Sequence, residues 1–178
     1  MLLQDPVSRF SELYGIYERS FPEVEKRTEA GQRAVWENPR VRVRIMERDG
    51  RIAAFLSCWK LENCLFVEHL ATDPECRGGG LGRLLMEECI LEANEAGIPV
   101  VLEIEPVTEE RPDTVRRAAF YERLGFCVNH FPYEQPPLQE GAPVIPLSVM
   151  TYGRPMDEGE FQPYKTEIYR EVYGREAF

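Results

Sequence analysis

The sequence predicts an α/β fold in which one mixed β-sheet carries helices on both faces. Three strand-like segments follow one another between residues 41 and 72 with short turns between them, which is typical of an antiparallel meander. Two helical segments then alternate with strands, which indicates crossover connections and a parallel pair. One of these later strands, Val100–Ile104, is almost entirely apolar, as expected when both of its faces are covered.

The N-terminal part is expected to begin with two helices. Asp5 and Pro6 supply an N-cap and a proline at the first helical position, and apolar residues then recur at helical spacing to about Arg19. A second, more polar helix is expected to begin within residues 20–23 and to run to about Trp36, since Asn38-Pro39 would end it.

The meander is indicated by alternation and by turn residues. Val41, Val43 and Ile45 alternate with arginines, which predicts a half-buried strand. Asp49-Gly50 is a typical hairpin turn, so the next strand should cover residues 52–59. A second short turn leads to a strand over residues 65–72.

The later elements follow from helical spacing and from glycine and proline positions. Gly97 is the residue expected just past the end of the first of these helices. The expected order is a helix over residues 81–96, the strand over residues 100–104, a helix capped by Asp113 or Thr114 and ending at Leu124, a strand beginning at residues 126–128, an irregular stretch over residues 132–143, a strand over residues 144–152, and a helix containing Phe161 and ending at Gly174.

Length and composition limit the class of protein. A chain of 178 residues is expected to form one domain over residues 1–178. The five cysteines are odd in number and include no C-x-x-C pair, which argues against a metal site or a disulfide scaffold and for a reducing compartment. No apolar run approaches the roughly 18 residues of a membrane span, and the first residues lack the features of a signal peptide. We therefore expect a cytoplasmic protein with no membrane partner.

The net charge of −10 disfavours nucleic acid as a partner, because the phosphate backbone would be repelled. The charge is compatible with a cationic, amine-bearing substrate, although solubility is the simpler reason for it.

The most informative motif is Arg77-Gly78-Gly79-Gly80-Leu81-Gly82-Arg83, between a predicted strand and a predicted helix. Glycines let a ligand approach the backbone, and the N-terminus of the helix offers free N–H groups to an anion such as phosphate. The spacing matches neither the dinucleotide fingerprint G-x-G-x-x-G nor the Walker loop. It does fit R-x-x-G-x-G, formed by Arg77, Gly80 and Gly82.

A second motif lies 44 residues after Arg77, where residues 118–126 read A-A-F-Y-E-R-L-G-F. Together the two motifs resemble the GCN5-related N-acetyltransferase (GNAT) family, whose second motif is A-x-x-F-Y-E-x-L-G-F. Phe21-Pro22 followed by Glu25-Lys26-Arg27 is also similar to a common F-P-x-x-E-R segment of that family. The resemblance covers a cofactor-binding core of about residues 41–131. Residues 132–178, which include the last strand and helix over residues 144–174, match no family-wide motif.

The resemblance implies the GNAT fold, in which two central parallel strands splay apart and acyl-CoA inserts between them. Acetyl-CoA would then be the acyl-donor cosubstrate. The implied contacts are backbone N–H groups of Leu70, Ala71 and Thr72 for the pantetheine and thioester, and the loop formed by Arg77, Gly78, Gly79, Gly80, Leu81, Gly82 and Arg83 for the pyrophosphate. Thr114 stands where many members have a cofactor-contacting asparagine. Arg116 and Arg117 either reach a CoA phosphate or pair with Glu109 and Glu110.

The resemblance also assigns the chemistry. Tyr121 corresponds to the tyrosine that donates a proton to the departing CoA thiolate, and a phenol is a neutral donor at pH 7. The acceptor ammonium must lose a proton before it attacks, and a carboxylate could accept this proton directly or through water. Glu68 is the first candidate for this base, and Glu103 or water are the alternatives. We expect the neighbouring His69 to face the opposite side of the sheet.

The implied function is acetyl transfer from acetyl-CoA to a primary amine by direct attack in a ternary complex. The acceptor is an amine-bearing small molecule or peptide that the sequence does not identify, and the chain is a monomer or a homodimer. The alternative is a non-catalytic acyl-CoA sensor or interaction module on the same fold, which would need only the glycine loop.

Overall fold

The computed structural model describes residues 1–176, so residues 177–178 of the predicted domain lie outside the described residues. The α-helices are α1 (Phe10–Ser20), α2 (Glu29–Glu37), α3 (Leu81–Ala96), α4 (Pro112–Arg123) and α5 (Glu158–Val172). The strands are β1 (Leu2–Leu3), β2 (Val41–Arg48), β3 (Arg51–Lys60), β4 (Leu65–Thr72), β5 (Val100–Ile104), β6 (Phe126–Val128), β7 (Tyr133–Gln135) and β8 (Ile145–Tyr152).

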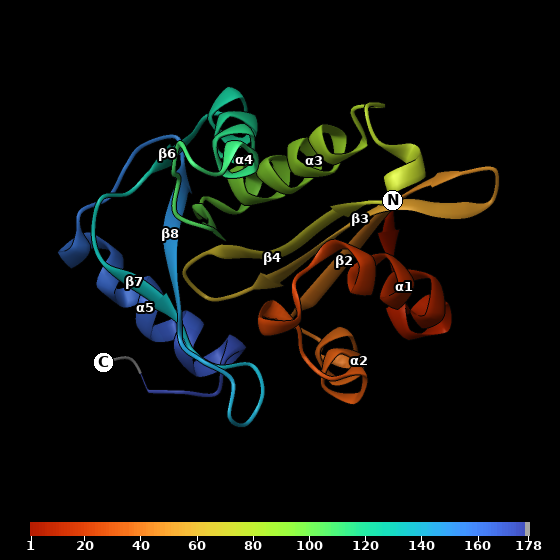
Figure 1. Cartoon of the computed structure of the whole chain (residues 1–178), viewed down its shortest axis with the longest axis horizontal. Helices are drawn as coiled ribbons and strands as arrows, with labels where there is room; N and C mark the ends of the chain where they lie inside the picture. Colours follow the sequence, from red (N-terminus) through yellow and green to blue (C-terminus); the bar gives the residue numbers. More distant parts are fainter. Residues whose placement is uncertain (177–178) are drawn as a thin grey trace.

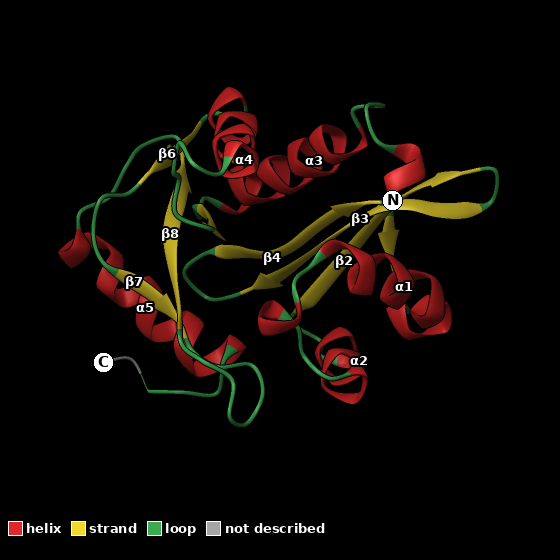
Figure 2. Cartoon of the chain, viewed as in Figure 1, coloured by secondary structure: helices red, strands yellow, loops and turns green. Residues whose placement is uncertain are grey.

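The strands form one mixed sheet in the order β1-β2-β3-β4-β5-β8-β6, with β7 paired to β8 (Figure 2). The pair β4–β5 is parallel, and the other pairs are antiparallel. The predicted meander β2-β3-β4 and the predicted mixed sheet are therefore confirmed. The hairpin turn between β2 and β3 has positive φ angles at Asp49 (51°) and Gly50 (76°), as a two-residue Asp-Gly turn requires.

Helices cover both faces of the sheet, as predicted (Figure 1). One face packs against α1, α2 and α5 through a core that contains Trp36, Phe55 and Phe161. The other face packs against α3 and α4 through Leu85, Met86 and their neighbours. Residues of β3 alternate between these two cores, so this strand is buried on both sides.

Three local predictions differ from the structure. The second helix begins at Thr28, whose side chain accepts a hydrogen bond from the N–H of Gly31, while residues 23–25 form only a short 3₁₀ turn. Helix α4 begins at Pro112 after Arg111, so neither Asp113 nor Thr114 is its N-cap. The stretch expected to be irregular contains the three-residue strand β7, which pairs with β8 from Tyr133↔Leu147 to Gln135↔Ile145.

Among residues 1–176, no helix has both the length and the hydropathy that crossing a bilayer demands.

Candidate active site

The glycine loop leads directly into α3. Gly78 and Gly80 have φ angles of 82° and 72°, a region that residues with a Cβ rarely adopt. Gly80 is the N-cap of α3 and contributes no side-chain bond to the amides of the first turn. Those N–H groups are left for a ligand, and the positive end of the helix dipole lies at the same place. The loop thus has the form of an anion cradle.

Strands β4 and β5 separate next to this loop. Their parallel ladder joins Leu65 to Val100, Phe66 to Val101 and Val67 to Leu102. At Glu68 a β-bulge interrupts the pairing of β4 with β3, because Ser57 pairs with His69 and Cys58 pairs with Val67. The rest of β4, from Leu70 to Thr72, stays paired to β3 but leaves the side toward β5 open.

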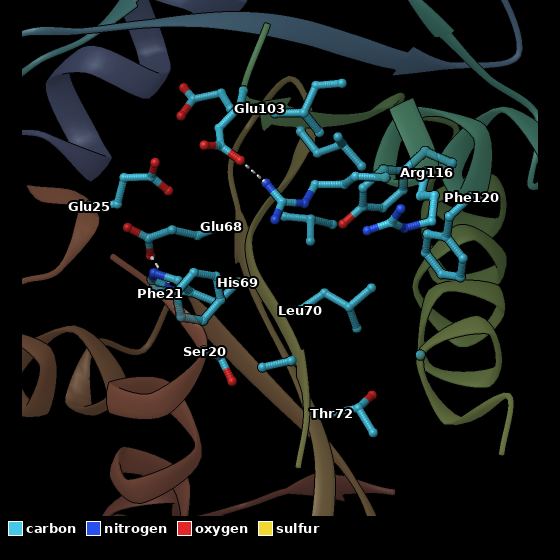
Figure 3. Close-up of a pocket in the computed structure, with 18 of the residues that line it drawn as sticks. Ser20, Phe21, Glu25, Glu68, His69, Leu70, Thr72, Glu103, Arg116 and Phe120 are labelled. Carbon is cyan, nitrogen blue, oxygen red and sulfur yellow. Dashed lines mark hydrogen bonds and ion pairs between the residues drawn. The ribbon is translucent and has the colours of Figure 1, made fainter. Parts of the chain in front are cut away.

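The space between the separated strands is a cavity of about 650 Å³. Figure 3 shows the residues around it, with Leu70 and Thr72 on β4 opposite Phe120 and Arg116 on α4. Most of the predicted site residues line this cavity: Glu68, Leu70, Ala71, Thr72, Arg77, Gly78, Gly79, Gly80, Leu81, Gly82, Arg83, Arg117 and Tyr121.

Thr114 is placed elsewhere. It is buried, and its hydroxyl donates to the carbonyl of Arg111 at 2.8 Å and accepts from the N–H of Thr108 at 3.1 Å. The side chain therefore holds the loop before α4 together and is not part of the cavity wall. This position gives no support to the predicted cofactor contact of Thr114.

Arg117 lines the cavity while it is paired with Glu105, the residue just after β5. Arg111 pairs with the same carboxylate at 2.6 Å. Of the two alternatives considered for Arg117, pairing with Glu109 and Glu110 is therefore wrong, since this arginine pairs with Glu105. The carboxylate ties the start of α4 to the end of β5 at the edge of the cavity.

Tyr121 extends from α4 into the cavity wall. Its ring packs edge-on against Phe120 and Phe126, with centroids 5.0 and 5.8 Å apart. Burial raises the pKa of Tyr121 to about 12. The phenol is therefore protonated at neutral pH and can act as a hydrogen-bond or proton donor.

Glu68 lies in a buried ion pair. Its carboxylate accepts from the Arg27 guanidinium and from the Trp59 indole N–H at 2.8 Å. Burial alone would raise the pKa of Glu68, but Arg27, His69 and the Trp59 hydrogen bond together outweigh burial and hold this pKa below its usual range. A carboxylate stabilised in this way is a weak proton acceptor. Arg27 directly follows the F-P-x-x-E-R-like segment of the sequence, but its long-range pairing with Glu68 has no local signal.

Glu103 on β5 has a different environment. The hydroxyls of Tyr133 and Tyr173 both donate to its carboxylate, the latter at 2.7 Å. Burial raises the pKa of Glu103 to about 7, against the opposing effect of these two hydrogen bonds. Tyr133 on β7 and Tyr173 just past α5 are functional candidates that the sequence did not suggest, because both come from the part without a family motif.

The prediction that His69 faces away from Glu68 is wrong. The bulge at Glu68 breaks the period-two alternation of the strand, so both side chains lie on the side of Ser20 and Phe21 (Figure 3). The His69 ring packs edge-on against Tyr17 and Phe21, each with a centroid distance of 4.9 Å. Burial lowers the pKa of His69 to about 4, so the imidazole is neutral at pH 7.

Comparisons with known proteins agree with this geometry. The model of the Acetyltransferase (GNAT) family matches residues 10–126. "Putative acetyltransferase YjbC" of Bacillus subtilis (strain 168) is 36% identical over 67 residues, which cover 38% of this chain and 33% of that protein. The match therefore spans about a third of the relative's length.

The fold is shared along the whole chain. A solved structure described as "Putative acetyltransferase from GNAT family" of Bacteroides thetaiotaomicron has 28% identity and a TM-score of 0.82, with 99% of both chains covered. The ribosomal-protein-S18-alanine N-acetyltransferase from Escherichia coli has 21% identity and a TM-score of 0.64, with 88% of this chain and 94% of that chain covered.

An aminoglycoside 6'-N-acetyltransferase in complex with coenzyme A has 14% identity and a TM-score of 0.62, covering 85% of this chain and 95% of its own. The predicted acyl-CoA N-acyltransferase fold is thereby confirmed.

Proposed function

The chain belongs to the GNAT family of acetyltransferases, and from this premise we propose that it transfers an acetyl group from acetyl-CoA to a primary amine by direct attack. The family uses acetyl-CoA as its donor. The observation that carries the proposal is the cavity itself. One continuous space is lined by the glycine loop, by Tyr121 and by the buried carboxyl group of Glu103.

The residues at the glycine-loop end fit the donor. Positive φ angles at Gly78 and Gly80 keep the loop open to an anion, and an added Cβ at either position would meet no neighbouring atom. The amides at the start of α3, together with Arg77, Arg83 and Arg116, would hold the pyrophosphate. Leu70 to Thr72, on the open side of β4, would hold the pantetheine and direct N–H groups to the thioester carbonyl. Such donors stabilise a developing oxyanion by a few kcal/mol.

Tyr121 is the proposed general acid. The thiolate of CoA gains a proton as the carbon–sulfur bond breaks, and a protonated phenol in the cavity wall can supply it. The pKa of the phenol needs no further adjustment for this step, because burial keeps the group protonated.

Glu103 is the proposed general base, in place of Glu68. A base that works near neutral pH should have a pKa close to 7, and that of Glu103 is about 7. Glu68 is ionised and held by Arg27, and removing its charge by protonation would leave the buried guanidinium unpaired. We assign Glu68 the role of fixing Arg27 and the adjacent wall of the cavity.

A thiol-release assay with acetyl-CoA and a panel of primary amines tests the proposal. We expect amine-dependent release of CoA together with an acetylated product of the expected mass. Tight binding of acetyl-CoA without turnover of any amine in a broad panel would instead support the acyl-CoA sensor.

A further inference from the structure

Several residues that line the cavity outside the glycine loop and α4 carry unpartnered polar atoms. We call the acceptor half the part of the lining formed by Ser20, Phe21, Glu25, His69, Glu103, Gln135 and Tyr173. Among the described residues, the buried side-chain polar atoms without a hydrogen-bond partner are Ser20 Oγ, His69 Nδ1, Gln135 Nε2 and the amide of Gln32. Three of the four side chains concerned thus belong to the acceptor half. An unpaired buried polar group destabilises the folded chain, and a ligand that pairs with it removes this cost.

Gln135 is the best placed of these three. Residues Tyr133 to Gln135 form β7 with a buried-exposed-buried pattern, so the first and last side chains point to the same face. Tyr133 donates to Glu103 from that face, and Gln135 lines the cavity one repeat further along the strand. Two residues of a strand span about 7 Å. Gln135 and Glu103 thus line the same cavity, and we infer that an acceptor held at Glu103 extends toward Gln135.

The charges of the acceptor half exclude one class of acceptor. The arginines that line the cavity, within the described residues, are Arg77, Arg83, Arg116 and Arg117, all from the glycine loop and the starts of α3 and α4. Arg27 lies behind the acceptor half, but it already donates to Glu68 and to the carbonyl of Val172 at 3.2 Å. Among the described residues that line the acceptor half there is no lysine or arginine to balance a carboxylate, whereas Glu25 and Glu103 would repel one.

We propose that the acceptor is a primary amine that carries an uncharged oxygen, a carbonyl or a hydroxyl, close to its nitrogen and has no free carboxylate, and that the side-chain amide of Gln135 donates to this oxygen. The inference rests on the proposed acetyl transfer and adds the substrate class. Gln135 is a specificity-determining residue in this assignment, because it binds the acceptor away from the reacting atoms.

Four small amines of similar size provide the test: alaninamide, 2-amino-1-propanol, isopropylamine and alanine. Their kcat/KM values are measured with the wild-type chain and with Gln135→Met, which keeps the side-chain length and removes the donor. We expect the substitution to lower kcat/KM at least tenfold for whichever of the amide or the amino alcohol is preferred, and to change it less than twofold for isopropylamine. For each amine, the kcat/KM of the variant is divided by that of the wild type, so differences in basicity between the amines cancel.

The exposed Gln162 on α5 supplies the matched control, since Gln162→Met should change none of the four values. The inference would be overturned by an equal loss for all amines, by no loss for any of them, or by a wild-type preference for alanine. Acetyl transfer itself would still stand in each of these cases. If no amine of any kind is acetylated, the proposed function fails and this inference fails with it.

Discussion

Two side chains of the cavity have raised pKa values for the same reason but are left in different states at neutral pH. Burial raises the pKa of Tyr121 to about 12 and that of Glu103 to about 7. The phenol is therefore fully protonated, while the carboxyl group is divided between its acid and base forms. A donor and an acceptor of protons are thus present in one cavity, which suits a reaction that removes a proton from an amine and delivers one to a thiolate.

Replacement of Tyr121 by phenylalanine tests the donor. We expect Tyr121→Phe to lower kcat at least tenfold, because the departing thiolate loses its proton source, while the Kd of acetyl-CoA changes little. Steady-state kinetics and calorimetry measure the two quantities. Tyr152→Phe is the control, since Tyr152 packs against Phe126 outside this cavity. Unchanged turnover, with chemistry shown to be rate-limiting, would contradict the acid role.

The acid–base state of Glu103 predicts a pH profile. With a pKa of about 7, the base form increases from pH 6 to 8, so kcat/KM should rise with pH and level off above about 8. Glu103→Gln should lower kcat/KM by about 10²-fold or more and remove the inflection near pH 7. An inflection that persists in the variant would assign the base to water or to another group.

The same raised pKa makes a separate prediction for stability. Between pH 4.5, the ordinary value, and about 7, the folded chain keeps a proton on Glu103 that the unfolded chain releases. The folded state thus binds more protons, and this residue makes the free energy of unfolding fall as pH rises through that window. Urea denaturation at pH 5 and pH 8 should therefore show Glu103→Gln gaining stability relative to wild type at the higher pH. A difference between the two proteins that is independent of pH would contradict the assigned pKa.

The bulge in β4 and the segment between α1 and α2 are joined by an ion pair. The bulge turns Glu68 to the same face as His69, and Arg27 reaches this carboxylate from the segment before α2. The backbone N–H of Arg27 also donates to the Tyr17 hydroxyl at 2.8 Å. These contacts fix one wall of the acceptor half against α1.

The Arg27–Glu68 pair is buried, so we expect the loss of one partner to lower the folding stability strongly. Arg27→Met leaves the Glu68 carboxylate buried and uncompensated, and we expect it to cost about 3–5 kcal/mol of folding stability. The double variant Arg27→Met, Glu68→Gln should recover most of this loss, because both charges are gone. Arg154→Met, in an exposed pair with Glu160, is the control and should have a much smaller effect. Urea denaturation measures all three, and a double variant as unstable as Arg27→Met would contradict the interpretation.

The elements also show what the sequence could predict. Strand β4 and helix α3 were predicted with their observed bounds, because alternation, helical spacing and glycine are local signals. The start of α2 and the strand β7 were missed. The helix was expected to begin within residues 20–23, whereas its N-cap is Thr28. Strand β7 exists because it pairs with β8, ten or more residues later. The orientation of His69 was wrong since a bulge depends on cross-strand pairing that a single strand does not reveal.

For the molecule as a whole, the cavity combines a half that local sequence determines with a half that only folding assembles. Residues 77–83 are contiguous, so their anion-binding geometry follows from the motif. The acceptor half brings together the end of α1, β4, β5, β7 and the end of α5, which are spread over more than 150 residues. Tyr133, Gln135 and Tyr173 became candidates only when these elements met around Glu103.

Acetyl-CoA should stabilise the whole chain, because it binds the folded state and not the unfolded one. At a concentration of acetyl-CoA 100 times its Kd, the gain is about 2.7 kcal/mol, which raises the Tm of a domain of this size by roughly 5–10 °C. In the proposed binding mode Arg77→Ala removes a donor to the pyrophosphate, so the Tm shift of this variant at the same concentration should be much smaller. Arg123→Ala makes the same change of net charge on the outer part of α4 and should keep the full shift. Calorimetric scans of the three proteins with and without ligand measure these shifts. Equal shifts in all three would remove Arg77 from the binding site, and no shift in the wild type would remove the cradle itself.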